Sequence, residues 1–240
     1  MSHEMILCIP GPWQDRTEFL RRVIALEPMG RHMFAGGILA DVAAKDHVPL
    51  EFCSEDSQIP EAFALAGQGK LSSTLLAQLA EHKSVAYAHF PLDFPAQKTR
   101  VIHFAEVLQK IGGIAVKVES AGVAHAWDRW FALLNGSPFD HYCSVVVLIG
   151  DSDGYYSCGM HHFGLPECAV PRFVPVEEAA DLMNRFNYWQ IVEKPALSSG
   201  HTFSLSEDSP HFHLTLSPDS RHPTDHPFFN EHGVWHLDAA

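Results

Sequence analysis

The sequence predicts an α+β protein with a mixed or antiparallel sheet, helices packed on one face, and two ferredoxin-like or related lobes. Three of the expected helices carry apolar residues at the i, i+3, i+4, i+7 spacing of an amphipathic helix. Short apolar runs bounded by proline and glycine lie between the helices and are typical of strands. Residues 151–154 (Asp-Ser-Asp-Gly) separate two such runs and indicate a hairpin turn.

In the first half of the chain we expect a strand, a helix, two strands, a helix, a strand and a longer helix. They cover residues 5–9, 14–26, 38–42, 49–53, 72–80, 84–90 and 97–111. Ser72 is a suitable N-cap for the second helix, because its hydroxyl can accept a hydrogen bond from the first turn. Gly112 and Gly113 end the third helix, since glycine readily adopts the conformation at which helices stop.

In the second half we expect a strand, a helix, a hairpin, another helix and a second hairpin. They cover residues 114–118, 124–134, 142–149 with 155–160, 176–186, and 202–205 with 211–216. This order divides the chain into an N-terminal α/β lobe (1–82), a central and C-terminal α+β lobe (83–216), and an irregular tail rich in histidine and proline (217–240). The side chains expected to be buried in the core are Phe104, Leu108, Trp130, Leu182 and Met183.

The composition argues against nucleic-acid and membrane partners. The chain has 29 Asp+Glu against 16 Lys+Arg, a formal charge of -13, and no cluster of basic residues. Phosphate backbones and anionic bilayers attract clustered Lys and Arg, so neither is an expected partner. No apolar run approaches the ~18 residues of a membrane-spanning helix.

The first residues and the cysteines indicate a cytoplasmic protein. The apolar run 5–9 follows Glu4 and lacks both the basic segment and the long apolar stretch of a signal peptide. The cysteines are odd in number and widely spaced, which indicates reduced thiols. They are Cys8, Cys53, Cys143, Cys158 and Cys168.

Residues 159–167 (Gly-Met-His-His-Phe-Gly-Leu-Pro-Glu) are the most distinctive segment of the chain. Polar side chains here meet a glycine-bearing loop, where binding sites are often built, so we expect His161, His162 and Glu167 to belong to a site. On a strand the two histidines would point to opposite faces, and only one could face a pocket. A carboxylate such as Glu119 or Glu167 would be its partner.

A second candidate follows the strand expected at 114–118. Glu119, His125, Trp127 and Trp130 combine an acid, an imidazole and two indoles, which suits a small-molecule or peptide pocket. The alternative is that the two indoles lie in the core of an amphipathic helix, as tryptophans at helical spacing usually do.

The two candidates would form one site if the strands at 114–118 and 155–160 belonged to one sheet. Glu119, His125, Glu167 and one of the two adjacent histidines would then line a common cleft walled by an indole. A carboxylate beside an imidazole would favour its charged form and make a polar recognition point.

Histidines are concentrated near the C-terminal end. Seven of the 17 are His201, His211, His213, His222, His226, His232 and His236. His211 and His213 share one face of a strand, and His222, His226 or Asp225 would be a third metal ligand. However, His222 and His226 each precede a proline, and no H-E-x-x-H motif is present. We interpret them as exposed histidines, expect no zinc bound stoichiometrically by the tail, and assign no metal site and no cofactor.

Residues 112–125 (Gly-Gly-Ile-Ala-Val-Lys-Val-Glu-Ser-Ala-Gly-Val-Ala-His), followed by Trp130, form a recognisable pattern together with residues 159–167, which read as Gly-Met-x-x-Phe-Gly-x-Pro-Glu. Both patterns resemble a bacterial family labelled as a domain of unknown function (number 4261). The resemblance covers roughly residues 84–171. It implies an α+β fold and no established activity.

The sequence contains no nucleophile elbow, no phosphate-binding glycine motif and no cofactor fingerprint. The leading hypothesis is therefore an uncharacterised cytoplasmic binding or interaction module without catalytic activity, whose ligand is a protein or a small molecule. The alternative is a metal-assisted, hydrolase-like enzyme that uses His161 or His162 with histidines of the tail. Convergence of His161, His211 and His213 would favour the enzyme. The oligomeric state is left open.

Overall fold

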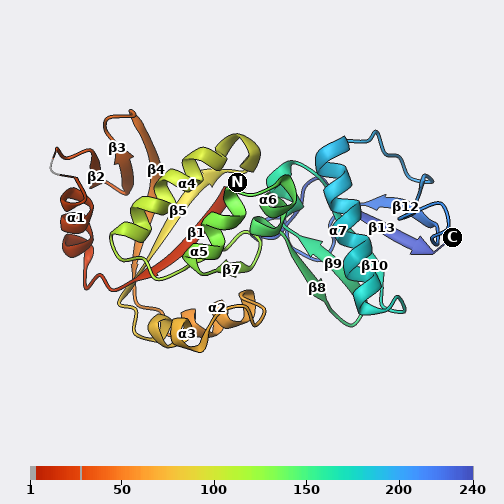
Figure 1. Cartoon of the computed structure of the whole chain (residues 1–240), viewed down its shortest axis with the longest axis horizontal. Helices are drawn as coiled ribbons and strands as arrows, with labels where there is room; N and C mark the ends of the chain where they lie inside the picture. The colour runs from red at the N-terminus through yellow and green to blue at the C-terminus, as the bar shows by residue number, and fades with distance from the viewer. Residues whose placement is uncertain (1–3, 28, 240) are drawn as a thin grey trace. The chain divides into compact units, whose positions relative to one another are not determined.

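The computed structural model describes residues 4–27 and 29–239 and divides the chain into two compact units (Figure 1). The boundary lies between Asn135 and Gly136, not near residue 82 where the sequence analysis divided the lobes. The reason is that strand β5 (Ser84–Pro91) pairs on one side with β4 (Asp46–Ser54) and on the other with β1 (Glu4–Gly11). Residues on both sides of the expected boundary therefore build one sheet.

The sheet of the N-terminal unit has seven antiparallel strands in the order β2-β3-β4-β5-β1-β6-β7. Its remaining strands are β2 (His32–Ala35), β3 (Ile38–Asp41), β6 (Val116–Val118) and β7 (Val123–His125). With helices α1 (Arg16–Ala25) and α4 (Phe94–Lys110), the succession β1–α1–β4–β5–α4–β6 is the β-α-β-β-α-β arrangement of a ferredoxin-like unit. The β2–β3 hairpin is inserted between α1 and β4, and two short helices are inserted between β4 and β5.

Helices cover both faces of this sheet, whereas the sequence analysis expected them on one face (Figure 1). The helices are α1 (Arg16–Ala25), α2 (Ile59–Ala66), α3 (Ser73–Ala80), α4 (Phe94–Lys110) and α5 (Trp127–Leu134). Phe63 of α2 packs in one apolar cluster with Cys8 and Val85, while Phe104 of α4 contacts Phe90 on the opposite face of β5. Both faces are covered because successive residues of β1 and β5, whose side chains point to opposite faces, are nearly all buried or half-buried.

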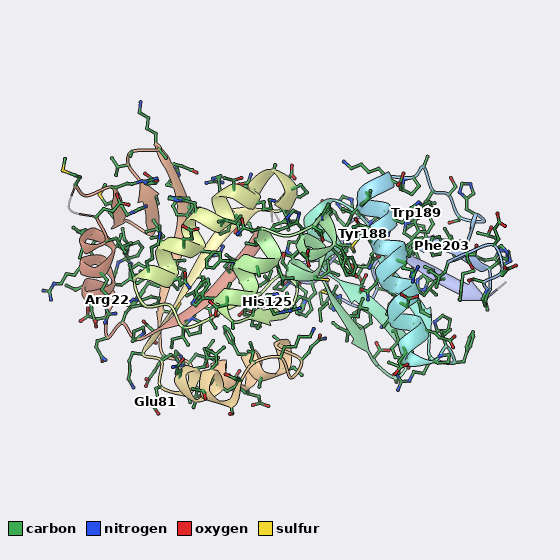
Figure 2. All side chains as sticks on the ribbon, in the orientation of Figure 1. Arg22, Glu81, His125, Tyr188, Trp189 and Phe203 are labelled. Atoms are coloured by element: carbon green, nitrogen blue, oxygen red, sulfur yellow. The ribbon has the colours of Figure 1, made fainter. Side chains whose placement is uncertain are left out.

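The C-terminal unit contains a six-stranded sheet in the order β11-β12-β13-β10-β9-β8. Its elements are α6 (Pro138–Val145), β8 (Val147–Gly150), β9 (Gly154–Cys158), the 3₁₀ turn η1 (Met160–Phe163), β10 (Glu167–Pro171), α7 (Val176–Glu193), β11 (Thr202–Phe203), β12 (Phe212–Ser217) and β13 (Val234–Ala239). Helix α7 packs on the sheet, and Trp189 lies beside Phe203 with ring centroids 5.3 Å apart (Figure 2). The strand order differs from that of the ferredoxin-like unit.

The α+β class with mostly antiparallel sheets is confirmed. Strands β8 and β9 pair antiparallel across residues 151–154, as expected. The side chains expected in the core are buried; they are Phe104, Leu108, Trp130, Leu182 and Met183. Among the described residues, no helix combines the length and apolarity needed to cross a membrane.

Two expected elements were wrong. The strand expected at 142–149 begins as helix α6, because Ser137 and Asp140 form a capping box around Pro138 and start a helix there. The tail expected to be irregular contains β13, which pairs with β12 and β10 near the middle of the sheet. Trp235 and Leu237, two positions apart, both face the core, and this spacing of two residues is typical of a half-buried strand.

Candidate functional site

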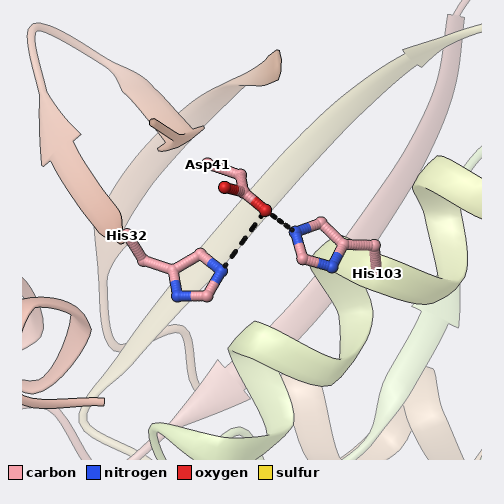
Figure 3. A group of neighbouring side chains, drawn as sticks. All are labelled: His32, Asp41 and His103. Carbon is pink, nitrogen blue, oxygen red and sulfur yellow. Dashed lines mark ion pairs between the residues drawn. The ribbon is translucent and has the colours of Figure 1, made fainter. Parts of the chain in front are cut away.

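Three side chains of the N-terminal unit bring possible metal ligands together (Figure 3). They are His32 on β2, Asp41 on β3 and His103 on α4, and their ligand atoms all lie within 4.8 Å of one another. The Asp41 Oδ2 atom is 2.9 Å from His103 Nε2 and 3.9 Å from His32 Nε2. In the part of the chain that the structure describes, this is the group of three His, Cys, Asp or Glu residues that meets the spacing for an ion.

A tight hairpin places His32 beside Asp41. Gly36 and Gly37 form the two-residue connection between β2 and β3, and both have positive φ angles, 59° and 81°. Two-residue hairpins favour such conformations, which glycine adopts without a steric penalty. The resulting register makes His32 the direct cross-strand partner of Asp41, and opposed Cβ atoms lie about 5 Å apart.

Helix α4 supplies the third side chain. Arg100, one turn before His103, ties the helix to β4 through Asp46, with Nε–Oδ2 of 2.7 Å and Nη2–Oδ1 of 2.9 Å. On the residue after His103, the Phe104 ring is fully buried. These two anchors hold His103 over the hairpin.

The hydrogen bonding of this group is incomplete. His32 is 5 % exposed and Asp41 is fully buried, yet neither ring nitrogen of His32 has a hydrogen-bond partner among the described residues. The close approach of His103 Nε2 to Asp41 also lacks the alignment of a hydrogen bond. A buried polar group left without a partner costs about 1–3 kcal/mol, so the arrangement is better suited to a ligand than to a purely structural role.

The protonation states suit a metal ion. Hydrogen bonds from Arg31 hold the pKa of Asp41 well below its usual range, assisted by the Ala44 backbone amide. Burial lowers the pKa of His32, which outweighs the opposing charge of Asp41. At neutral pH the carboxylate is ionised and the His32 imidazole is neutral, and these are the forms that coordinate metals.

The distinctive segment 159–167 forms a different cluster, in the C-terminal unit. Glu167 accepts hydrogen bonds from Ser157 Oγ (2.7 Å), Gly159 N (3.0 Å), Met160 N (2.8 Å) and Asn230 Nδ2 (3.0 Å). His161 Nδ1 lies 3.4 Å from the same carboxylate. Two of the expected site residues, His161 and Glu167, therefore come together. The Glu167 carboxylate, however, already accepts four hydrogen bonds, two of them from backbone amides of residues 159 and 160 in the same loop.

His162 is also part of this loop. It is fully buried, and its Nδ1 lies 3.0 Å from the Gly159 carbonyl oxygen. Burial lowers the pKa of His162 well below its ordinary value. The neutral ring thus supports the 3₁₀ turn from inside the unit.

The other expected site residues belong to the N-terminal unit. Glu119 pairs with Lys117 (2.5 Å), and the His125 ring lies 5.7 Å from the fully buried Trp130 ring. Trp127 is 8 % exposed and donates a hydrogen bond from Nε1 to the Gly113 carbonyl. Both indoles therefore lie on the side of α5 that is buried in the core of the N-terminal unit.

The two expected site segments do not share a sheet. Residues 116–118 form β6 of the seven-stranded sheet, whereas 154–158 form β9 of the six-stranded sheet. The expectation of one sheet carrying both segments was wrong, because the first half and the second half of the chain each close their own sheet. That the two segments line a common cleft stays a prediction.

The tail histidines are arranged in smaller groups. His222 lies 3.3 Å from Asp219 and stacks on His226 with ring centroids 5.0 Å apart. His213 lies on β12 opposite Asp238. Over the described part of the tail, no three of the residues searched meet the ligand spacing of an ion. That the tail binds no stoichiometric zinc stays a prediction.

None of the three residues of the His32–Asp41–His103 group was expected from the sequence. The Gly36-Gly37 pair was interpreted only as a turn, although a two-residue glycine turn predicts a hairpin and with it the pairing of residues 32 and 41. No comparable signal in the sequence indicates His103, because its approach depends on how α4 packs on the sheet.

No model of a known protein family matches the chain, and no curated protein or solved structure matches it significantly. The resemblance to the bacterial family of unknown function therefore stays a prediction.

Proposed function

We propose that this protein binds one divalent transition-metal ion, of the zinc class, through His32, Asp41 and His103. Two imidazoles and a carboxylate are a donor set that zinc and its neighbours in the periodic table accept. The proposal keeps the binding function of the leading sequence hypothesis and names a metal as its ligand.

One observation carries the proposal: His32 is buried and neither of its ring nitrogens makes a hydrogen bond among the described residues, although an ionised carboxylate and a second imidazole lie beside it. The competing interpretation is an ion-pair cluster that only ties α4 to the hairpin. In that case the Asp41–His103 contact would suffice, and a buried His32 without a hydrogen bond would only destabilise the unit. A bound ion gives the His32 ring a partner.

Three protein ligands leave a coordination position for water or a small molecule, as in open zinc sites. The alternative of a hydrolase built on His161 or His162 has less support, because the Glu167 carboxylate beside His161 already accepts four hydrogen bonds. Among the described residues, neither histidine belongs to a group of three with the spacing of metal ligands. The proposed site is therefore a metal-binding site first, and its open position is where any small ligand would attach.

The test is a titration of the chelator-treated protein with Zn²⁺ by calorimetry, and with Co²⁺ by absorption spectroscopy. We expect one ion per chain, with the visible bands of a tetrahedral cobalt site, and loss of binding in His32→Ala and His103→Ala. His89→Ala is the matched control, because His89 is a histidine of the same unit that pairs with Glu4 instead. Absence of binding by the unchanged protein, or equal binding by all three variants, would contradict the proposal.

A further inference from the structure

Arg31 occupies the Asp41 oxygen that faces both histidines, Oδ2. Its Nε and Nη2 atoms donate to Asp41 Oδ2 at 2.9 and 2.7 Å. His103 Nε2 approaches the same oxygen, while Asp41 Oδ1 accepts the Ala44 amide. A carboxylate oxygen offers about two lone-pair sites, so an ion on Oδ2 must displace at least one of the arginine bonds.

A second carboxylate is within reach of the same guanidinium. Glu27 Oε1 lies 3.9 Å from Arg31 Nη1, and the Glu27 side chain is 43 % exposed where that of Asp41 is 0 %. The Arg31 backbone is fixed, because its carbonyl accepts a hydrogen bond from the Val42 amide. Its side chain is 40 % exposed, which leaves room for it to move between the two acids.

Electrostatic repulsion decides which of the two acids Arg31 pairs with when an ion is bound. A guanidinium and a divalent cation on one oxygen repel each other strongly at short distance in a buried setting. Without an ion, the buried Asp41 needs the positive charge of Arg31. With an ion bound, that charge is supplied by the metal, and Arg31 is better placed on the solvent-exposed Glu27.

Resting on the proposed metal site, we infer that Arg31 is an internal competitor of the metal: it holds Asp41 in the metal-free protein and transfers to Glu27 when the ion binds. Metal affinity is thereby set by an exchange of ion pairs within the hairpin region. The opposite possibility is that Arg31 orients Asp41 and supports the ion, as outer-sphere hydrogen bonds often do. The two differ in the sign of the effect of removing Arg31.

The experiment measures Zn²⁺ affinity, by competition with a chromophoric chelator, for the unchanged protein, Arg31→Met, Glu27→Gln and the double variant. We expect Arg31→Met to bind Zn²⁺ on the order of ten-fold more tightly. Glu27→Gln weakens binding by about two-fold, and this effect disappears in the Arg31→Met background, since the two residues then share no interaction. Arg129→Met, which removes an exposed arginine from α5 of the same unit, is the control for net charge.

The outcomes separate the two proposals. Absence of Zn²⁺ binding by the unchanged protein would overturn the metal site itself. Zinc binding that Arg31→Met leaves unchanged or weakens would overturn the competition while the site stands. Circular dichroism of each metal-free variant shows whether it is folded. If Arg31→Met is poorly folded, Arg31→Lys replaces it in the test. Lysine keeps the positive charge but lacks the two parallel N–H donors of the guanidinium, and this variant should retain most of the competition with the metal.

Discussion

Asp41 in the N-terminal unit and Glu167 in the C-terminal unit are both buried acids, but their surroundings differ in kind. Glu167 is surrounded by backbone amides, a hydroxyl and a carboxamide that satisfy its oxygens. Asp41 accepts hydrogen bonds from the charged Arg31 and is faced by two imidazoles, one of which, His32, makes no hydrogen bond among the described residues. Burial alone does not mark a candidate ligand. Within the described ranges, Glu167 already accepts four hydrogen bonds and His161 beside it lacks a partner only at Nε2, whereas His32 beside Asp41 makes no hydrogen bond from either ring nitrogen.

The largest expected effect is on stability, at Glu167. Glu167→Ala should destabilise the C-terminal unit by about 3 kcal/mol or more, because several buried donors lose their acceptor at once. Urea unfolding followed by circular dichroism measures the change. Glu178→Ala, at an exposed position in the first turn of α7, is the control and should have little effect. A loss below about 1 kcal/mol would mean that the Glu167 network is not structural.

The next largest effect concerns Asp41, the buried carboxylate of the N-terminal unit. If Asp41 binds an ion, Zn²⁺ at about 100 times its dissociation constant should stabilise the folded N-terminal unit by about 2.7 kcal/mol. Asp41→Asn should abolish this stabilisation, since the amide is a weaker metal ligand than a carboxylate. Thermal unfolding with and without Zn²⁺ measures it, and an equal shift in Asp41→Asn would place the ion elsewhere.

A smaller effect tests the unpartnered imidazole in the absence of metal. His32→Leu should stabilise the metal-free protein by about 1 kcal/mol, because it removes two buried nitrogens that make no hydrogen bond. The same variant should bind no Zn²⁺. His161→Leu is the matched comparison in the C-terminal unit and should be destabilising, since His161 Nδ1 lies beside Glu167. A destabilised His32→Leu would show that the His32 ring already has a structural role.

The smallest effect concerns Asp46, a carboxylate with solvent access and a charged partner. Hydrogen bonds from Arg100 lower the pKa of Asp46, against the opposing effect of burial. Because the folded pKa lies below the unfolded value of about 3.9, the contribution to stability is complete above that pH and is lost as the pH falls through the folded pKa. Both side chains are about one-third exposed, so the contribution is below about 1 kcal/mol.

Arg100→Gln should therefore flatten the loss of stability between about pH 5 and pH 2 by this small amount. Urea unfolding at a series of pH values measures it. Parallel stability curves for the two proteins would show that the Asp46–Arg100 ion pair does not contribute.

Local patterns of the sequence predicted much of the fold. The apolar stripe of α4 and the hairpin at 151–154 were found, because both depend on residues a few positions apart. Helix α6 was missed although Ser137 and Asp140 carry a capping box, since apolar residues after it resembled a strand. Strand β13 was missed because proline and histidine around it obscured its alternation.

The candidate site was less predictable than the fold. His161 and Glu167 were expected to meet and do so, because both belong to one short loop. The pairing of His32 with Asp41 could have been predicted from the Gly36-Gly37 hairpin turn, but the position of His103 could not. Its position depends on the packing of Phe104 and the Arg100–Asp46 ion pair, which join distant segments.

By itself the sequence determined the α+β class, the amphipathic helices and the hairpin turns, because periodicity, caps and turn residues act over a few neighbouring positions. Only the tertiary structure decided that the chain divides at residue 135, that β13 pairs with β10, and that α4 carries His103 to the β2–β3 hairpin. Those features follow from how complementary apolar faces pack across the whole unit, and such packing is a property of many distant residues at once.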